Sequence, residues 1–208
     1  MVVRKLAPAL AAGCTTVVKS AGETPFTACA LTALAIRAGV PKGVINVLSA
    51  LDNTPAIGLA ICKSNVVRKI SFTGSTRVGK LLMEQSGSTL KKLSLELGGN
   101  APFIVFNDAN LDVAVSAAVG SKFKSSGQTC VCSNRIMVQS GIYSAFLQRL
   151  KEEVAKFVVG PAADRRTSHG PLIHAAAANR MKSLVEESVR EGAIVEIGGG
   201  KRPDLGKS

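Results

Sequence analysis

The chain has 208 residues, enough for one large domain or two small ones with a sizeable core. Apolar residues make up 46% and charged residues 19%, which excludes a disordered tail or linker. Since no apolar run approaches the roughly 20 residues of a membrane span, we expect no membrane segment. The first residues also lack the apolar core of a secretory leader. We therefore expect a soluble globular protein.

The net charge is +12, from 26 Lys and Arg against 14 Asp and Glu. Such an excess suits nucleic acid, an anionic membrane, or small molecules that carry phosphate or carboxylate groups. The basic residues are scattered, however, and one Tyr with no Trp gives little aromatic surface for stacking on bases. We expect neither a nucleic-acid partner nor a membrane partner.

In the first half of the chain, apolar runs and turn residues alternate in a way that predicts parallel βαβ units with right-handed crossovers. The predicted strands span residues 15–19, 44–48, 67–73 and 92–97, and the predicted helices span 4–12, 25–38, 55–62 and 75–85. Thr24 is the expected cap of the second helix, with Pro25 at its first position and Gly39 after its end.

After Gly98 and Gly99 the alternation begins again, which places a domain boundary near residues 98–101. We therefore predict an α/β protein with domains 1–98 and 99–208. In the second domain the predicted strands span 102–106, 134–139 and 194–197, and the predicted helices span 111–124, 142–157 and 175–190.

The five cysteines form no C-x-x-C pair, and their odd number favours reduced thiols in the cytosol or an organelle matrix. Three of them lie in apolar segments and are expected to be core residues: Cys14, Cys29 and Cys62. Cys130 and Cys132 are expected to lie outside the core.

Gly74 and Ser75 stand where a predicted strand turns into a helix. Glycine lets a ligand approach the backbone, and the free N–H groups of a helix start favour phosphate. The turn is either a pyrophosphate site or an ordinary strand–helix turn with a serine cap.

Residues 74–80 also match the G-x-x-x-x-G-K pattern of a P-loop. A P-loop needs Ser or Thr at the next position to hold Mg²⁺, and Leu81 stands there. Gly79 would moreover lie inside the predicted helix, so the pattern does not support a nucleotide triphosphatase.

Cys130 follows the polar, glycine-containing stretch from Gly127 to Thr129. Neighbouring donors that stabilise its thiolate would make it a nucleophile, and the alternative is a free surface thiol. A zinc site with Cys132 would need more ligands. Because His169 and His174 are expected in a surface loop and at a helix start, we predict no metal site.

Glu96 ends an apolar strand just before Gly98 and Gly99. A carboxyl group buried there is costly without a role and suits a general base. The alternative is a salt-bridged glutamate at a strand end.

Together, Leu95–Gly99 and Gly127–Cys130 strongly resemble the glutamate and cysteine signatures of the aldehyde dehydrogenase superfamily. The resemblance runs from Met1 to about Arg202 and is closest to succinate-semialdehyde dehydrogenases. It implies part of a Rossmann-type cofactor domain followed by part of a catalytic domain, and oxidation of succinate semialdehyde in 4-aminobutyrate catabolism.

The resemblance also implies site residues. Cys130 would form a thiohemiacetal and then a thioacyl group with the aldehyde, its backbone N–H would supply half of the oxyanion hole, and Glu96 would activate water. Cys132 would form a reversible disulfide with Cys130. The implied cofactor is NAD or NADP, bound by Lys19 at the ribose, Gly74 and Ser75 at the pyrophosphate, and Leu97 and Gly98 beside the nicotinamide.

The sequence departs from the family pattern at three positions. Gly22 replaces an acidic residue, which leaves room for a 2′-phosphate beside Lys19 and predicts that NADP is accepted at least as well as NAD. Lys124 replaces the subfamily's carboxylate-binding arginine, so the charge is kept and the bidentate geometry is lost. Ser125 stands where asparagine is usual.

The family's oxyanion asparagine and a Glu-x-Phe-Gly-Pro segment would fall before Met1 and beyond Ser208. We therefore expect a partial enzyme with little or no activity by itself; the alternative is a non-catalytic remnant that keeps only cofactor or protein binding. The resemblance implies a homo-oligomeric parent enzyme in the cytoplasm or the mitochondrial matrix.

Overall fold

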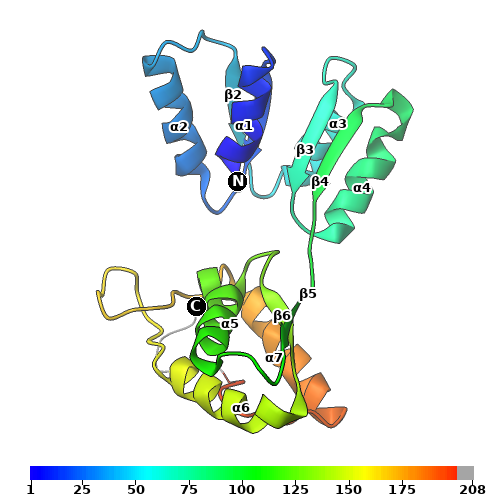
Figure 1. Ribbon diagram of the computed structural model, residues 1–208. Helices are drawn as coiled ribbons and strands as arrows, with labels where there is room; N and C mark the ends of the chain where they lie inside the picture. The colour runs from blue at the N-terminus through cyan, green and yellow to red at the C-terminus, as the bar shows by residue number, and fades with distance from the viewer. Residues whose placement is uncertain (201–208) are drawn as a thin grey trace. The chain divides into compact units, whose positions relative to one another are not determined.

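The computed structural model describes residues 1–200 and divides between Gly98 and Gly99 into two compact units. Each unit contains parallel strands joined by helices, which confirms the predicted α/β class (Figure 1). None of the helices within residues 1–200 is long and apolar enough to cross a bilayer.

The four strands of the first unit form two parallel pairs. β1 (Thr16–Ser20) pairs with β2 (Ile45–Ser49), and β3 (Lys69–Thr73) pairs with β4 (Lys92–Glu96). In the second pair, Thr73 lies opposite Glu96, so the turn that follows β3 and the carboxyl end of β4 are neighbours.

The helices of the first unit are α1 (Val2–Ala11), α2 (Pro25–Arg37), α3 (Thr54–Lys63) and α4 (Thr76–Ser86), followed by the short 3₁₀ helix η1 (Gly87–Thr89). Thr24 occupies the N-cap position of α2 but makes no side-chain capping bond. α3 and α4 pack beside β3 and β4 (Figure 1). Their core is formed by Cys62, Ile70 and Leu82.

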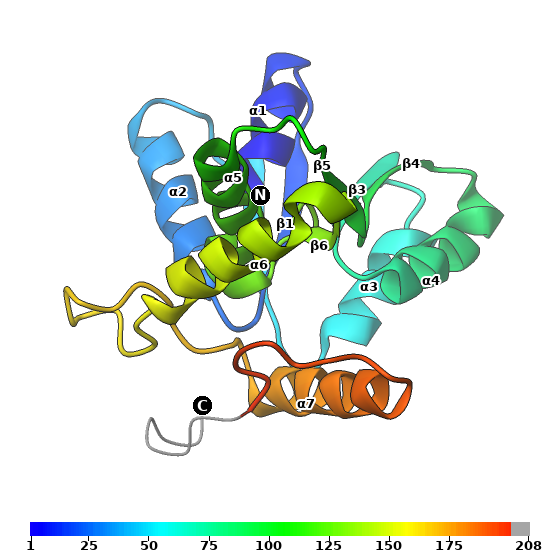
Figure 2. The same ribbon diagram turned by 60° about the horizontal axis from the view of Figure 1, so that its bottom comes forward.

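The second unit is built on the parallel pair β5 (Ala101–Val105) and β6 (Ser133–Val138). Its helices are α5 (Leu111–Phe123), α6 (Ser140–Ala155) and α7 (Ala175–Arg190). The short segment η2 (Lys124–Gly127) directly after α5 has non-helical backbone at Ser125 and Ser126 and belongs to a loop. α5 and α6 pack on each other and on β6, around a core of Val105, Val115, Ala118 and Phe146 (Figure 2).

The strand predicted over residues 194–197 is absent from the structure, which has irregular backbone there. Glycines with positive φ stand on both sides, at Gly192 (+100°) and Gly198 (+74°), and Ile194 is 82% exposed. An apolar run becomes a strand only where a neighbouring strand accepts its hydrogen bonds. Within residues 1–200, β5 and β6 pair only with each other.

The predicted burial of the cysteines is correct for Cys62 and wrong for three others. Cys14 and Cys29 are exposed, and Cys132 is buried. Cys29 lies on α2, whose residues are apolar on all faces, so its periodicity gives no sign of which face packs inward. Cys132 directly precedes β6, where Ser133 is also buried.

Candidate active site

The turn from β3 into α4 has the geometry of an anion site. The Gly74 N–H donates to the carbonyl of Glu96 at 3.1 Å, and Ser75 Oγ accepts from the Val78 N–H at 3.3 Å. This cap engages one first-turn donor. The N–H groups of Thr76 and Arg77 have no partner within the helix and point toward the positive end of its dipole. The serine cap and an anion site are therefore compatible.

Gly79 lies buried inside α4, as predicted, and not in a phosphate loop. A Cβ at this position would come within 2.6 Å of Leu97 Cδ2, so the glycine makes room for Leu97. The resemblance of residues 74–80 to a P-loop is therefore a coincidence of sequence.

The residues after β4 lie along the start of α4. Leu97 packs over Gly79, and a Cβ at Gly98 would stand 3.7 Å from Thr76 Oγ1. The structure thus brings the expected nicotinamide neighbours, Leu97 and Gly98, beside the expected pyrophosphate turn.

Lys19 lies near the end of β1 and Gly22 follows that strand, both near the segment that leads from β2 to α3. Lys19 Nζ donates to Thr54 Oγ1 at 3.2 Å. A Cβ at Gly22 would lie 2.8 Å from the carbonyl oxygen of Ala50 and 2.8 Å from Leu51 Cδ1. A side chain at position 22, a carboxylate included, would require the backbone at Ala50 and Leu51 to move.

Glu96 is exposed, so its expected burial in an apolar environment is wrong. Its side chain is 45% exposed and lies 3.9 Å from both Arg4 Nη1 and Lys5 Nζ of α1. The side chains of β4 alternate between partly buried and exposed, and Glu96 falls on the exposed face. The structure shows the alternative that the sequence left open, a glutamate among cations at a strand end.

Cys130 is exposed at the end of an irregular loop that follows α5. Ser125, Ser126 and Gly127 have left-handed backbone conformations, with φ of 53°, 55° and 74°. The loop closes with a turn in which the Cys132 N–H donates to the Thr129 carbonyl at 3.1 Å. The turn leaves the Cys130 thiol at the surface and the Cys132 thiol buried.

Gly99 touches the backbone of Cys130, a contact that the sequence did not indicate. A Cβ at Gly99 would come within 2.8 Å of the Cys130 carbonyl oxygen. Asn134 Nδ2 donates to the Gly99 carbonyl at 3.3 Å, and Lys122 Nζ donates to Asn134 Oδ1 at 2.7 Å. The second glycine of the Gly98-Gly99 pair was the available signal, because adjacent glycines often mark close backbone approaches.

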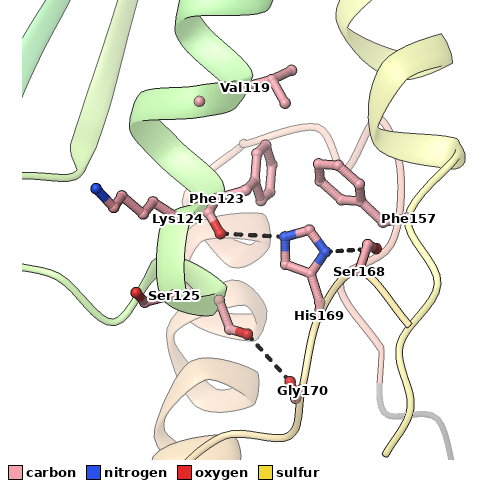
Figure 3. Close-up of a pocket in the computed structure, with 10 residues that line it drawn as sticks. Val119, Phe123, Lys124, Ser125, Phe157, Ser168, His169 and Gly170 are labelled. Atoms are coloured by element: carbon pink, nitrogen blue, oxygen red, sulfur yellow. Dashed lines mark hydrogen bonds between the residues drawn. The ribbon is translucent and has the colours of Figure 1, made fainter. Parts of the chain in front are cut away.

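Lys124 directly follows α5 and is exposed. It borders a cavity of about 430 Å³ whose walls include Phe123, Phe157 and His169. In Figure 3 its ammonium group points away from these rings.

Two further predictions concern the histidines and metal. His174 is the N-cap of α7, as expected at a helix start, and His169 lies in the loop before it. In the part of the chain that the structure describes, no three His, Cys, Asp or Glu side chains gather as a metal site would need.

The candidate residues divide between the two units. Lys19, Gly22, Gly74, Ser75, Glu96, Leu97 and Gly98 belong to the first unit, and Lys124, Cys130 and Cys132 belong to the second. In the first set, Gly74, Ser75, Leu97 and Gly98 lie at the turn suited to phosphate, and the second set includes the accessible thiol of Cys130.

The profile of the Aldehyde dehydrogenase family matches residues 1–208, the whole chain. This chain belongs to the aldehyde dehydrogenase family. The crystal structure of succinate-semialdehyde dehydrogenase from Burkholderia pseudomallei superposes with a TM-score of 0.95 at 51% identity and covers 100% of this chain.

Among curated relatives, this aldehyde dehydrogenase chain is 54% identical over 207 residues to succinate-semialdehyde dehydrogenase [NADP(+)] 1 of Schizosaccharomyces pombe. It is 50% identical over 199 residues to a glutarate-semialdehyde dehydrogenase of Pseudomonas putida. These matches cover 99% and 96% of the chain but 41% of each relative. The chain therefore spans about two fifths of the length of the curated relatives it matches.

Proposed function

We propose that this chain carries the nucleophile, the general base and part of the cofactor site of an NAD(P)-dependent dehydrogenase for semialdehydes that bear a carboxylate. Succinate semialdehyde, oxidised to succinate in 4-aminobutyrate catabolism, is the proposed substrate. The observation that carries the proposal is the exposure of Cys130 on a loop whose backbone conformation is held in place, within a chain of the aldehyde dehydrogenase family.

Cys130 is the proposed nucleophile. Its thiolate attacks the aldehyde carbon and forms a C–S bond, while the carbonyl oxygen takes the negative charge and its backbone N–H donates to that oxygen. Oxidised nicotinamide, when bound, supplies the two-electron acceptor for the hydride of this thiohemiacetal. The product of the oxidation is a thioester on Cys130.

Glu96 is the proposed general base. It removes a proton from a water molecule, the resulting hydroxide equivalent attacks the thioester carbon, and the C–S bond breaks to release the acid and the Cys130 thiolate. The exposure of Glu96, whose side chain is 45% exposed, keeps its carboxylate accessible to water.

The residues present fit a dinucleotide. Gly74, Ser75 and the first-turn N–H groups of α4 would hold the pyrophosphate, Leu97 and Gly98 would lie beside the nicotinamide, and Lys19 would bind at the ribose. Because no carboxylate fits at Gly22, nothing there would repel a 2′-phosphate. We therefore propose that NADP binds at least as tightly as NAD. A calorimetric titration that finds much weaker binding of NADP would contradict this.

Lys124 is the proposed partner of the substrate carboxylate. Its ammonium group keeps the positive charge but cannot form the paired hydrogen bonds of a guanidinium. In a full-length enzyme that contains this segment, we expect Lys124→Arg to lower the KM for succinate semialdehyde relative to the KM for an uncharged aldehyde of similar length.

The proposal includes a reversible disulfide between Cys130 and Cys132. Peroxide would accept the two electrons and two protons that the thiols lose, and the S–S bond would block the nucleophile. Since Cys132 is 1% exposed, the turn at residues 129–132 must open for the bond to form. Peroxide should inactivate the protein reversibly by thiol reduction, and Cys132→Ser should abolish that reversibility.

The test of the function follows the Cys130 thiol. Iodoacetamide should label Cys130 faster than the other four cysteines, and succinate semialdehyde should slow that labelling by occupying the sulfur. In a full-length enzyme that contains this segment, Cys130→Ala should abolish formation of NADPH, whereas Cys132→Ser should retain it. Equal labelling of Cys130 and the exposed Cys29 would contradict the proposed nucleophile, and this readout does not depend on turnover.

The proposal also covers the cellular compartment of the protein and its binding partners. The free cysteines suit a reducing compartment, the cytoplasm or the mitochondrial matrix. We propose a homo-oligomer and no nucleic-acid partner, which size-exclusion chromatography with light scattering and a binding assay with nucleic acid would test.

A further inference from the structure

We propose that the segment 169–173 positions the loop that carries Cys130, and that His169 is the positioning residue at its centre. This inference rests on the proposed function only for the role of Cys130. The structural claim concerns residues 123–128, which contact the segment at three separate points.

The loop after α5 has a backbone that its own sequence disfavours. Ser125 and Ser126 both adopt left-handed conformations, in which the Cβ atom of an L-residue crowds the following carbonyl oxygen. Such conformations persist where surrounding contacts enforce them. Within the loop, the Gln128 N–H donates to the Ser125 carbonyl at 3.1 Å.

The segment 169–173 supplies three further hydrogen bonds. His169 Nε2 lies 3.2 Å from the Phe123 carbonyl, and Ser126 Oγ donates to the Gly170 carbonyl at 3.2 Å. The Ile173 N–H donates to Gln128 Oε1 at 3.2 Å. The three bonds fall before, within and after the left-handed residues, so they fix both ends and the middle of the loop.

His169 is held in one orientation by its neighbours (Figure 3). Because the Phe123 carbonyl can only accept, Nε2 carries the hydrogen of that bond, and Nδ1 lies 2.9 Å from the Ser168 hydroxyl oxygen. The ring lies 4.1 Å from Phe157 and 6.4 Å from Phe123, centroid to centroid. Hydrogen bonds and packing therefore specify the same position.

The segment that carries His169 is itself anchored. The His169 N–H donates to the Val158 carbonyl at 3.1 Å, and the Gly160 N–H donates to the His169 carbonyl at 3.0 Å. His169 forms a parallel β-bridge with Val159, and its ring bonds the Phe123 carbonyl at the end of α5. It therefore connects the two segments. Loss of the Nε2 donor would leave the Phe123 carbonyl without this partner and would free the first residues of the loop.

The experiment measures hydrogen exchange of residues 124–130 in the full chain, together with the rate of iodoacetamide labelling at Cys130. His169→Leu removes the donor and keeps an apolar side chain, and His169→Gln keeps an amide N–H that can reach the Phe123 carbonyl. His174→Ala is the matched control, because the His174 ring accepts from the Ala177 N–H at the start of α7.

In His169→Leu we expect exchange of residues 124–130 to rise about five- to tenfold, the range of a single lost hydrogen bond. Labelling of Cys130 should fall toward that of Cys29. His169→Gln should restore most of both values, and His174→Ala should leave both unchanged. Unchanged exchange in His169→Leu, or an equal rise in His174→Ala, would overturn the proposal.

Two results separate this inference from the proposed function. If Cys130 in the unaltered protein labels no faster than Cys29, the proposed nucleophile fails and the exchange measurement still decides the role of His169. If His169→Leu does not fold, Ser126→Ala replaces it, since it removes only the bond to Gly170. We then expect a smaller rise in exchange at residues 124–130, and no rise would overturn the proposal.

Discussion

The turn after β3 and the loop after α5 each present a proposed functional group at the end of a regular element, but they are held in different ways. The turn reaches Ser75 with φ of −70°, and Ser75 caps α4 by accepting from the N–H of Val78, three positions later. The loop passes through three left-handed residues, and its contacts come from residues more than 40 positions away. The helix cap of the first is local, and the backbone conformation of the second depends on tertiary contacts.

This difference determines what each site tolerates. The β3–α4 turn needs a glycine because the Phe72 ring would lie 2.4 Å from a Cβ at Gly74, and a short polar residue for the cap. The loop stores backbone strain that the 169–173 segment must offset. We therefore expect the effects of substitutions within the turn on stability to add independently. The effects of substitutions in the loop should depend on the residues of segment 169–173 that contact it.

The largest effect is expected for Gly99→Ala, which tests the loop after α5, the region that depends on tertiary contacts. The new Cβ would stand 2.8 Å from the Cys130 carbonyl oxygen, a backbone atom that cannot rotate away. We expect the free energy of unfolding to fall by about 1–3 kcal/mol, as for overpacked sites, and labelling of Cys130 to change. Gly87→Ala is the control, because nothing lies within 4 Å of its Cβ position and its backbone is helical. It should stabilise the protein slightly in urea unfolding.

Ser75→Ala tests the turn after β3, whose helix cap is local. Loss of the cap should lower the free energy of unfolding by about 1 kcal/mol. Ser75→Asp separates capping from anion binding, since aspartate caps α4 but places a negative charge beside the cofactor phosphates. Urea unfolding should find Ser75→Asp as stable as the unaltered protein, and calorimetry should find NADP binding weakened more than in Ser75→Ala. Undiminished NADP binding in Ser75→Asp would remove this turn from the cofactor site.

Ser125→Gly should stabilise the protein by about 0.5 kcal/mol, because glycine adopts the left-handed conformation at φ of 53° without the serine's strain. Ser144→Gly in the middle of α6 is the matched substitution and should destabilise it by about 0.5–1 kcal/mol. Thermal unfolding measures both. The same sign at both positions would show that strain is not stored in the loop.

The smallest effect concerns the loop that precedes His169. The side chain and backbone N–H of Arg166 hold the pKa of Asp164 below its ordinary value. A lowered folded-state pKa adds stability above the ordinary value near 4, and this is lost as the pH falls through the lowered value. Hydrogen exchange of residues 158–169 should rise below about pH 4, and Asp164→Asn should remove that dependence. Arg165→Gln, next to Arg166, should leave it in place.

Most of the fold follows from short-range signals in the sequence. Alternating apolar runs located the strands of both units, and the Gly98-Gly99 pair marked the place where the structure divides. The strand predicted over residues 194–197 failed because pairing is a tertiary property that a short apolar run does not specify. The prediction that Glu96 is buried failed for a related reason. The alternation along a strand shows that it has two faces but not which face is covered.

The sequence alone determined the order of the elements, the family and the residues that make up both signatures, since these depend on residue type and spacing. Tertiary structure alone decided that Cys132 is buried, that Gly99 touches the Cys130 backbone and that His169 reaches the end of α5. Each of these contacts joins residues whose proximity depends on how the helices pack. Residue spacing along the chain carries no information about such contacts until the core has formed.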